Sequence, residues 1–164
     1  MASALREKEE EYEVRLKALE EENALMQNNM KTAVLRHRKS IVEEILELRC
    51  PRCKRVFYDF DNCFALTCNG CRCGFCAYCL KDCGTDAHRH VAQCDMNRAP
   101  GKDVYGTEDM FVAAHRDRRR EKLIEYFREK VGDPRTKALL FDELSKGGDI
   151  SDLGLTAEML GFNR

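Results

Sequence analysis

The 164-residue sequence predicts a small metal-stabilised module flanked by helices, and three observations support this fold class. All ten cysteines lie within residues 50–94. Residues 1–48 contain neither Gly nor Pro and carry apolar residues at heptad spacing, as a coiled-coil helix does. Beyond a linker at 95–106, residues 107–148 show two helical patterns with capping residues, which predict an α-helical hairpin.

The cysteines form three Cys-x-x-Cys pairs, followed by a segment with two histidines and a last cysteine. Two thiolates on such a short turn reach one tetrahedral ion, and zinc takes four ligands of this kind. The predicted ligands are, for one zinc ion, Cys50, Cys53, Cys68 and Cys71 and, for a second, Cys76, Cys79, His90 and Cys94. His88 is the alternative to His90, which we prefer because it lies four residues before Cys94 on one face of a short helix. Four protein ligands leave no open coordination position, so both ions are expected to be structural.

Three cysteines remain outside these two sets. Cys73 and Cys83 are interpreted as packing residues near the metal, although Cys83 could instead replace a histidine ligand. Residues 56–60 alternate in polarity and residues 64–67 form a return strand, which predicts a short β-hairpin with Cys63 at its turn. An exposed thiol at this position could act as a nucleophile if its pKa were lowered.

The N-terminal segment carries the seam of a two-stranded coiled coil. One series of seam residues is Leu5, Tyr12, Leu19 and Met26, and its partner series is Leu16, Asn23 and Met30. Lys8 and Glu13 occupy flanking positions that pair across a parallel coil, and Arg15 and Glu20 repeat the pattern one heptad later. Asn23 within the seam also favours a parallel homodimer. The alternatives are a single amphipathic surface helix and a coil with another protein.

The apolar stripe of this helix changes phase after residue 30. It continues as Val34, Ile41, Ile45 and Leu48, and it becomes wider. The wider stripe predicts that this part of the helix packs against the zinc module that follows it.

The C-terminal helices are predicted from their caps. Thr107 precedes the first helix and Gly132 ends it, whereas Asp133 and Pro134 begin the second. The tail 149–164 is expected to hold a single short turn. The basic run at 115–122 is interleaved with acidic residues, which is typical of a solvated helix face.

The net charge and the hydropathy pattern limit the kinds of partner that we expect. The formal net charge is −1, and residues 50–94 hold six basic and four acidic residues, too small an excess to steer phosphate binding. Nucleic acid is therefore not an expected ligand. No apolar stretch approaches the length of a membrane span or forms a signal core. We expect an intracellular protein of the reducing cytoplasm or nucleus, where clustered cysteines bind zinc rather than form disulfides.

The cysteine-rich segment resembles the in-between-RING and second-RING modules of RING-between-RING ubiquitin ligases. The matching runs are Cys50-Pro-Arg-Cys53, Cys63-Phe-Ala-Leu-Thr-Cys68, Cys71 and Gly74-Phe-Cys76-Ala-Tyr-Cys79-Leu80. The resemblance implies a two-zinc fold. It also implies a catalytic cysteine, five positions before the third zinc ligand, that takes ubiquitin from a conjugating enzyme as a thioester. Cys63 occupies that position.

Two neighbours of Cys63 differ from the family pattern. The family usually has Gly directly before the nucleophile and His two residues after it as a general base, whereas this chain has Asn62 and Ala65. No first RING precedes the cluster in this sequence, so we expect that piece to come from a partner chain or from a RING of a longer protein of which this chain is a fragment. Two hypotheses follow: a ubiquitin-protein transferase that uses Cys63, with ubiquitin and a conjugating enzyme as partners, or a non-catalytic zinc platform for protein interaction, dimerised by its coiled coil. Whether the chain is an enzyme stays open at this stage.

Overall fold

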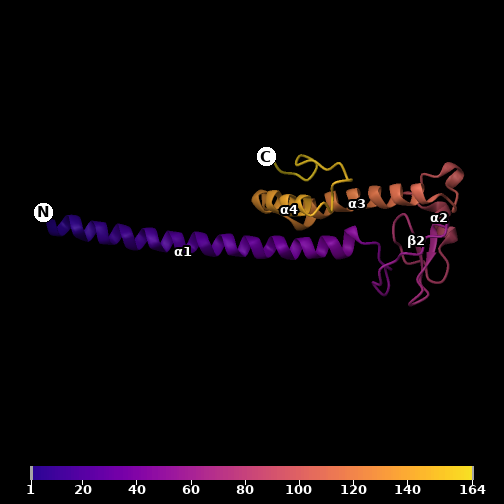
Figure 1. Cartoon of the computed structure of the whole chain (residues 1–164), viewed down its shortest axis with the longest axis horizontal. Coiled ribbons are helices and arrows are strands. Elements are labelled where there is room, and N and C mark those ends of the chain that lie inside the picture. Colours follow the sequence, from indigo (N-terminus) through magenta and orange to yellow (C-terminus); the bar gives the residue numbers. More distant parts are fainter. Residues whose placement is uncertain (1, 164) are drawn as a thin grey trace.

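The computed structural model describes residues 2–163 as one elongated molecule (Figure 1). Its elements are, in chain order, α1 (Ala2–Ile41), the π-helical turn η1 (Val42–Leu46), β1 (Ala65–Thr67), β2 (Gly74–Cys76), α2 (His88–Gln93), the 3-10 turn η2 (Pro100–Lys102), α3 (Glu108–Lys130) and α4 (Pro134–Lys146). The cysteine-rich module lies at one end, and the first part of α1 projects from the other. No helix in the described residues is long and apolar enough to cross a membrane.

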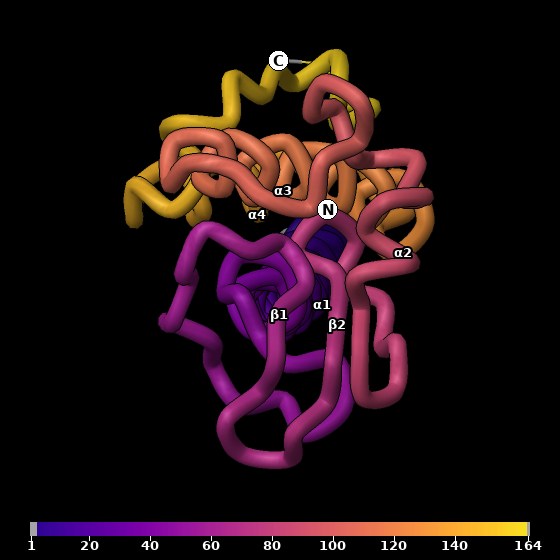
Figure 2. Tube along the Cα trace, turned by 90° about the vertical axis from the view of Figure 1, so that its right-hand side faces the viewer, coloured from indigo at the N-terminus to yellow at the C-terminus, as the bar shows by residue number. Residues whose placement is uncertain are grey.

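The second part of α1 packs against the C-terminal helices. Val34 and Ile41 of α1 and Ile45 of η1 are buried in one apolar core, together with residues of α3 and α4 such as Phe127 and Leu140. Viewed along α1, both C-terminal helices lie on the same side of it (Figure 2). The predicted packing of this stripe against the zinc module is therefore wrong, because α3 and α4 have apolar faces of their own and cover it first.

The tail after α4 closes this core. Ile150, Leu153, Leu160 and Phe162 are all buried in it. Thr156 begins one turn, in which its hydroxyl accepts a hydrogen bond from the Met159 backbone N–H at 3.3 Å. This is the short turn expected from the sequence, and the Leu153 backbone N–H, which donates to the carbonyl of Ile150 at 3.1 Å, adds a second turn before it.

The β-hairpin of the module is formed by β1 and β2, which pair antiparallel with Leu66 opposite Phe75. The predicted pairing of residues 56–60 with 64–67 is wrong, since Val56 instead forms an isolated bridge with Arg49. The physical reason is the turn that begins at Cys68. This turn reverses the chain directly after β1, and so the next segment, rather than the preceding one, becomes the partner strand.

The segment 95–106 lies against the module. Asn97 is buried, and its side-chain amide donates to the carbonyls of Val91 and Asp103 at 2.9 and 3.1 Å. Tyr105 then forms an antiparallel bridge with Cys63. Residues 104–106 thereby add a short edge beside the turn that carries Cys63.

Candidate metal centres and the Cys63 cluster

The first metal-ligand group lies where α1 leads into the module. The Sγ atoms of Cys50, Cys53, Cys68 and Cys71 all lie within 4.8 Å of one another. Two of the separations, Cys50 to Cys71 and Cys53 to Cys68, are 3.6 Å. Four thiolates bound to zinc at about 2.3 Å in a tetrahedron are about 3.8 Å apart, so the spacing fits zinc. Backbone N–H donation from Cys71 lowers the pKa of Cys68 to about 6, which favours the thiolate that a metal requires.

The second group combines a turn with a helix. Cys76, Cys79, His90 and Cys94 each offer one ligand atom within 4.8 Å of the others, and the Sγ of Cys79 is 3.2 Å from His90 Nε2. Helix α2 carries His90, and Cys94 follows directly after the helix ends. The structure thus brings together the same two sets of four residues that the spacing predicted, and each set could hold one zinc ion.

All three Cys-x-x-Cys turns have one backbone conformation. The residue after the second cysteine has a positive φ in each case: 64° at Lys54, 62° at Arg72 and 59° at Leu80. Its N–H donates to the carbonyl of the first cysteine, at 2.8 to 3.0 Å. This conformation costs a non-glycine residue roughly 1–2 kcal/mol. The repetition at three sites indicates that presenting both thiols to one ion requires it.

A buried arginine lies beside the second group. Arg118 of α3 is 3% exposed, forms no ion pair within the described residues, and has no partner for its Nε atom. Its guanidinium donates to His115 Nδ1 at 2.7 Å. Burial lowers the pKa of Arg118 to about 10, while the nearby Cys79 acts in the opposite direction. The basic run at 115–122 is thus not a wholly solvated face, because packing of α3 on the module buries this one member.

Arg118 and both metal groups border a shared cavity of about 580 Å³. Cys50 contributes to its wall from the first group and Cys79 from the second. A buried guanidinium needs a negative neighbour, and three thiolates with one zinc ion carry a net charge of −1. The chemistry of the second group therefore suits the unpaired charge of Arg118.

Cys63 is hydrogen-bonded to a histidine that is not in either metal group. Its Sγ lies 3.4 Å from Nε2 of His88, and His88 Nδ1 lies 2.5 Å from Oδ1 of Asp86. The hydrogen bond from His88 lowers the pKa of Asp86, so the carboxylate accepts the Nδ1 proton. The Nε2 lone pair then faces the thiol. Cys63, His88 and Asp86 form what we call the Cys63 cluster.

The structure shows how Asn62 and Ala65 are placed beside Cys63. Asn62 has a φ of 68°, and Asn is, after Gly, the residue type that best tolerates this region. The carbonyl of Ala65 lies 3.7 Å from the Cys63 thiol. An imidazole also contacts this thiol, and it belongs to His88, 25 residues further along the chain. Sequence reasoning considered His88 only as a metal ligand. When His90 is the metal ligand, His88 and the nearby Asp86 have no role in either metal group and are available to Cys63.

Stacked aromatic rings hold the Cys63 turn in place. Phe64 stacks on Tyr78 with ring centroids 4.5 Å apart, and Phe60 stacks on Phe111 of α3 at 4.2 Å. Phe64 also donates its backbone N–H to the carbonyl of Val104 at 2.8 Å. The residues on both sides of Cys63 are therefore anchored, while Cys63 itself is partly exposed.

The other two cysteines outside the metal groups lack such partners. Cys73 is fully buried, and burial raises its pKa to about 12. Cys83 donates to the carbonyl of Lys81 at 3.3 Å, and burial raises its pKa. Both therefore favour the thiol form, and neither has a histidine beside it among the hydrogen bonds of the described residues.

Comparison with known proteins adds no assignment. No family model matches the chain, and neither the curated proteins nor the solved structures contain a match. The two metal-ligand groups and the Cys63 cluster are therefore the features that indicate a function.

Proposed function

We propose that this chain is a zinc-binding transferase of the ubiquitin pathway that carries ubiquitin on Cys63. The observation that carries the proposal is the Cys63 cluster, in which the thiol contacts His88 Nε2 at 3.4 Å and Asp86 holds Nδ1. A nucleophile, a base and a group that orients the base are the parts that acyl transfer to a thiol requires. From the resemblance of residues 50–80 to the modules of RING-between-RING ligases, we infer that the acyl group is ubiquitin and that its donor is a charged conjugating enzyme.

Two acyl transfers make up the proposed reaction. In the first, His88 Nε2 takes the Cys63 proton, and the thiolate attacks the thioester carbonyl of a charged conjugating enzyme. The new C–S bond forms as the bond to the enzyme's cysteine breaks, and that cysteine leaves as a thiol with the proton from His88, so the imidazole is neutral again. In the second, an amine of the acceptor attacks the Cys63 thioester, His88 takes the proton from the amine, and Cys63 leaves as a thiolate that His88 can reprotonate.

The two zinc ions have a structural part in this proposal. Bound to the two groups of four residues, they would hold the three Cys-x-x-Cys turns and helix α2 in place, so that Cys63 and His88 stay within contact. With four protein ligands per ion, neither ion would offer a position to substrate. The chain's own residues therefore carry out each proton and acyl transfer.

The experiment uses the full chain loaded with zinc. On incubation with charged conjugating enzyme, we expect a ubiquitin adduct that a reducing agent cleaves and that Cys63→Ser abolishes or converts into a reduction-resistant ester. Cys83→Ser is the matched control, because Cys83 lies in the same module outside both metal groups, and it should leave the adduct unchanged. His88→Ala should slow adduct formation or discharge by about 10²- to 10⁴-fold, the typical contribution of a general base.

The second candidate is a non-catalytic platform for protein interaction. It is favoured by the exposed apolar residues of α1, which include Leu5, Tyr12 and Leu25. Zinc content would be the same for both candidates. The absence of any Cys63-dependent adduct with a panel of conjugating enzymes would reject the transferase in favour of the platform.

A further inference from the structure

One stripe of residues runs along α1 from its exposed part into its buried part. Its members follow one another at intervals of three or four residues: Leu5, Glu9, Tyr12, Leu16, Leu19, Asn23, Met26, Met30, Val34, His37, Ile41 and Ile45. With 3.6 residues per turn, this spacing keeps them on one face of the helix. We call this face the α1 stripe.

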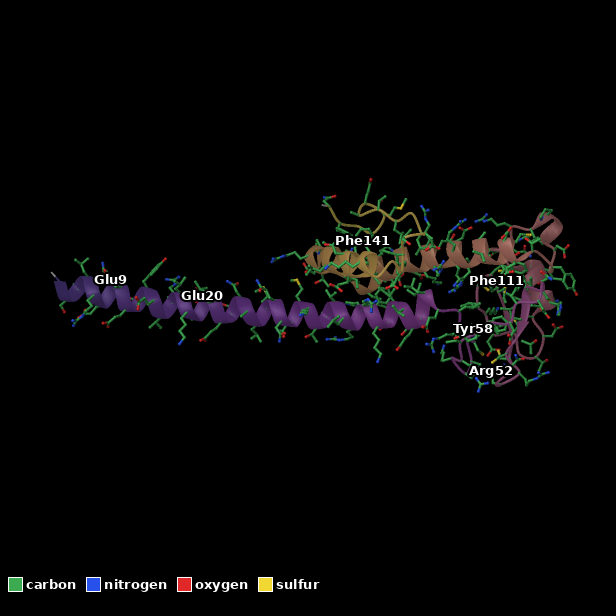
Figure 3. The ribbon with its side chains drawn as sticks, viewed as in Figure 1. Glu9, Glu20, Arg52, Tyr58, Phe111 and Phe141 are labelled. Carbon is green, nitrogen blue, oxygen red and sulfur yellow. The ribbon has the colours of Figure 1, made fainter. Side chains whose placement is uncertain are left out.

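The chain covers only the second part of the α1 stripe. Val34 and Ile41 are 3% and 0% exposed beneath α3 and α4. Leu16, Leu19 and Met26, on the same face, are 45%, 49% and 50% exposed. Figure 3 shows the side chains around Glu9 and Glu20 projecting from α1 with no other element beside them.

An uncovered helix of this length needs a partner. Every residue from 3 to 29 is exposed, so no tertiary contact within the chain stabilises this part of α1. Most of the stability of a protein helix comes from packing of its apolar face. The occupant must offer a helical stripe that is equally long and equally uncovered, and the same segment of a second copy does so.

The position of α4 decides the direction of pairing. In a parallel dimer, the second α1 would lie on the stripe and continue past residue 30. There it would meet α4, which already packs against α1 (Figure 1) and shares a buried core with Val34. In an antiparallel dimer, residue 5 of one copy lies opposite residue 30 of the other. The overlap then ends before α4 begins to cover the stripe.

We propose that two copies of this chain pair antiparallel through residues 5–30 of α1, with their zinc modules at opposite ends of the dimer. In this register Leu16 packs against Leu19 of the second copy at the centre. Asn23 lies beside Tyr12 of the second copy, whose hydroxyl can accept a hydrogen bond from the Asn23 side-chain amide. The seam thus has an apolar centre with a polar pair on each side.

The flanking charges do not decide this register. Arg15 lies next to Glu22 of the second copy on one side of the seam, and the symmetry repeats this attractive pair. On the other side Glu13 lies next to Glu20 of the second copy, and this repulsive pair, also repeated, offsets the attractive one. Surface pairs of this kind change an equilibrium constant by roughly two-fold each, whereas overlap of a second helix with α4 is not permitted at all. The steric argument therefore outweighs the parallel pattern of charges.

The first test is the mass of the full zinc-loaded chain in solution, measured by light scattering. We expect twice the chain mass of 18.9 kDa. Leu16→Asp combined with Leu19→Asp should give the single-chain mass. Val14→Asp is the matched control, because Val14 is 71% exposed in the same segment but off the stripe, and it should leave the mass doubled. A wild-type chain that stays monomeric at its highest soluble concentration would overturn the proposal.

The second test determines whether the two α1 helices pair parallel or antiparallel. Lys8 and Lys31 are about 35 Å apart along one helix, too far for a short lysine cross-linker within one chain. In the antiparallel register they approach across the dimer, so a Lys8–Lys31 cross-link should form between differently isotope-labelled copies. The double variant at Leu16 and Leu19 should lose this cross-link. Cross-links of Lys8 to Lys8 of the second copy, without Lys8 to Lys31, would show a parallel dimer and refute the antiparallel one.

Discussion

The molecule has two cores that are held together by different physical means. The helical core, formed by the second part of α1 with α3, α4 and the tail, contains buried aliphatic and aromatic residues such as Phe127 and Leu144. The core of the cysteine-rich module combines aromatic residues such as Phe64 and Phe75 with candidate metal-ligand cysteines such as Cys50 and Cys76. From this difference we expect that the first core forms by hydrophobic burial, whereas the second also depends on metal bound by its cysteines.

Metal removal should have the largest effect and should affect one core. Structural zinc contributes roughly 10–16 kcal/mol of apparent binding free energy, which is lost when a strong chelator takes the ion. We expect about two zinc ions per chain before chelation, from four ligands per ion, and reactive thiols with loss of the β-hairpin afterwards. The helical signal of α3 and α4 in circular dichroism should persist. Its disappearance along with the metal would show that the two cores do not fold independently.

A substitution that creates a cavity in the helical core should destabilise that core and leave the metal sites intact. Phe127 of α3 is fully buried in the helical core. Phe127→Ala should lower the free energy of unfolding by about 3–5 kcal/mol, because it removes a large apolar side chain and leaves a void. Zinc content measured by mass spectrometry or a metal indicator should stay at the wild-type value. The exposed Val112→Ala, on the same helix, is the control and should change stability little.

Arg118 lies on α3, the helix that contributes residues to both cores, and its substitution should weaken one metal site. Residues next to metal ligands typically affect metal affinity by 10- to 100-fold. We expect Arg118→Met to speed zinc release from the group that contains Cys79, while the group that contains Cys53 releases zinc at the wild-type rate. Release can be followed with a chromogenic chelator. The exposed Arg116→Met, also on α3, is the matched control. Equal acceleration at both sites would mean that Arg118 acts on the fold in general.

The smallest expected effect is a pH dependence at the same junction. Burial, followed by repulsion from Arg118, lowers the pKa of His115 to about 4, below the ordinary 6.5. A depressed histidine pKa means that its contribution to stability is present above about pH 6.5 and is lost as pH falls toward 4. Between pH 7.5 and 5.5 the loss should be about 1 kcal/mol. His115→Gln should remove this part of the pH dependence in denaturant unfolding, with metal content checked at each pH.

Residues whose chemistry is local were predictable from the sequence. The Cys-x-x-Cys spacing grouped the metal-ligand residues because such a turn presents both thiols to one point, and helical spacing favoured His90 over His88. Thr107 and Asp133 marked where α3 and α4 begin, since each accepts a backbone hydrogen bond at its helix start. In these cases the deciding interaction spans only a few residues.

Features that depend on distant contacts were not predictable. Strands β1 and β2 have three residues each, too few for alternation to show which segments pair. Arg118 lies in a charged run, and only the packing of α3 on the module buries it. The contact between Cys63 and His88 joins residues that are 25 positions apart, and nothing in the spacing of either one specifies it.

The residues with positive φ that follow the three Cys-x-x-Cys pairs make the metal-binding conformation of the module unfavourable when no metal is bound. None of Lys54, Arg72 and Leu80 is glycine, so each turn opposes its liganding conformation by roughly 1–2 kcal/mol until an ion is captured. This opposition raises the free zinc concentration at which the module becomes ordered. The fraction of molecules with an assembled Cys63 cluster would then depend on the concentration of free zinc.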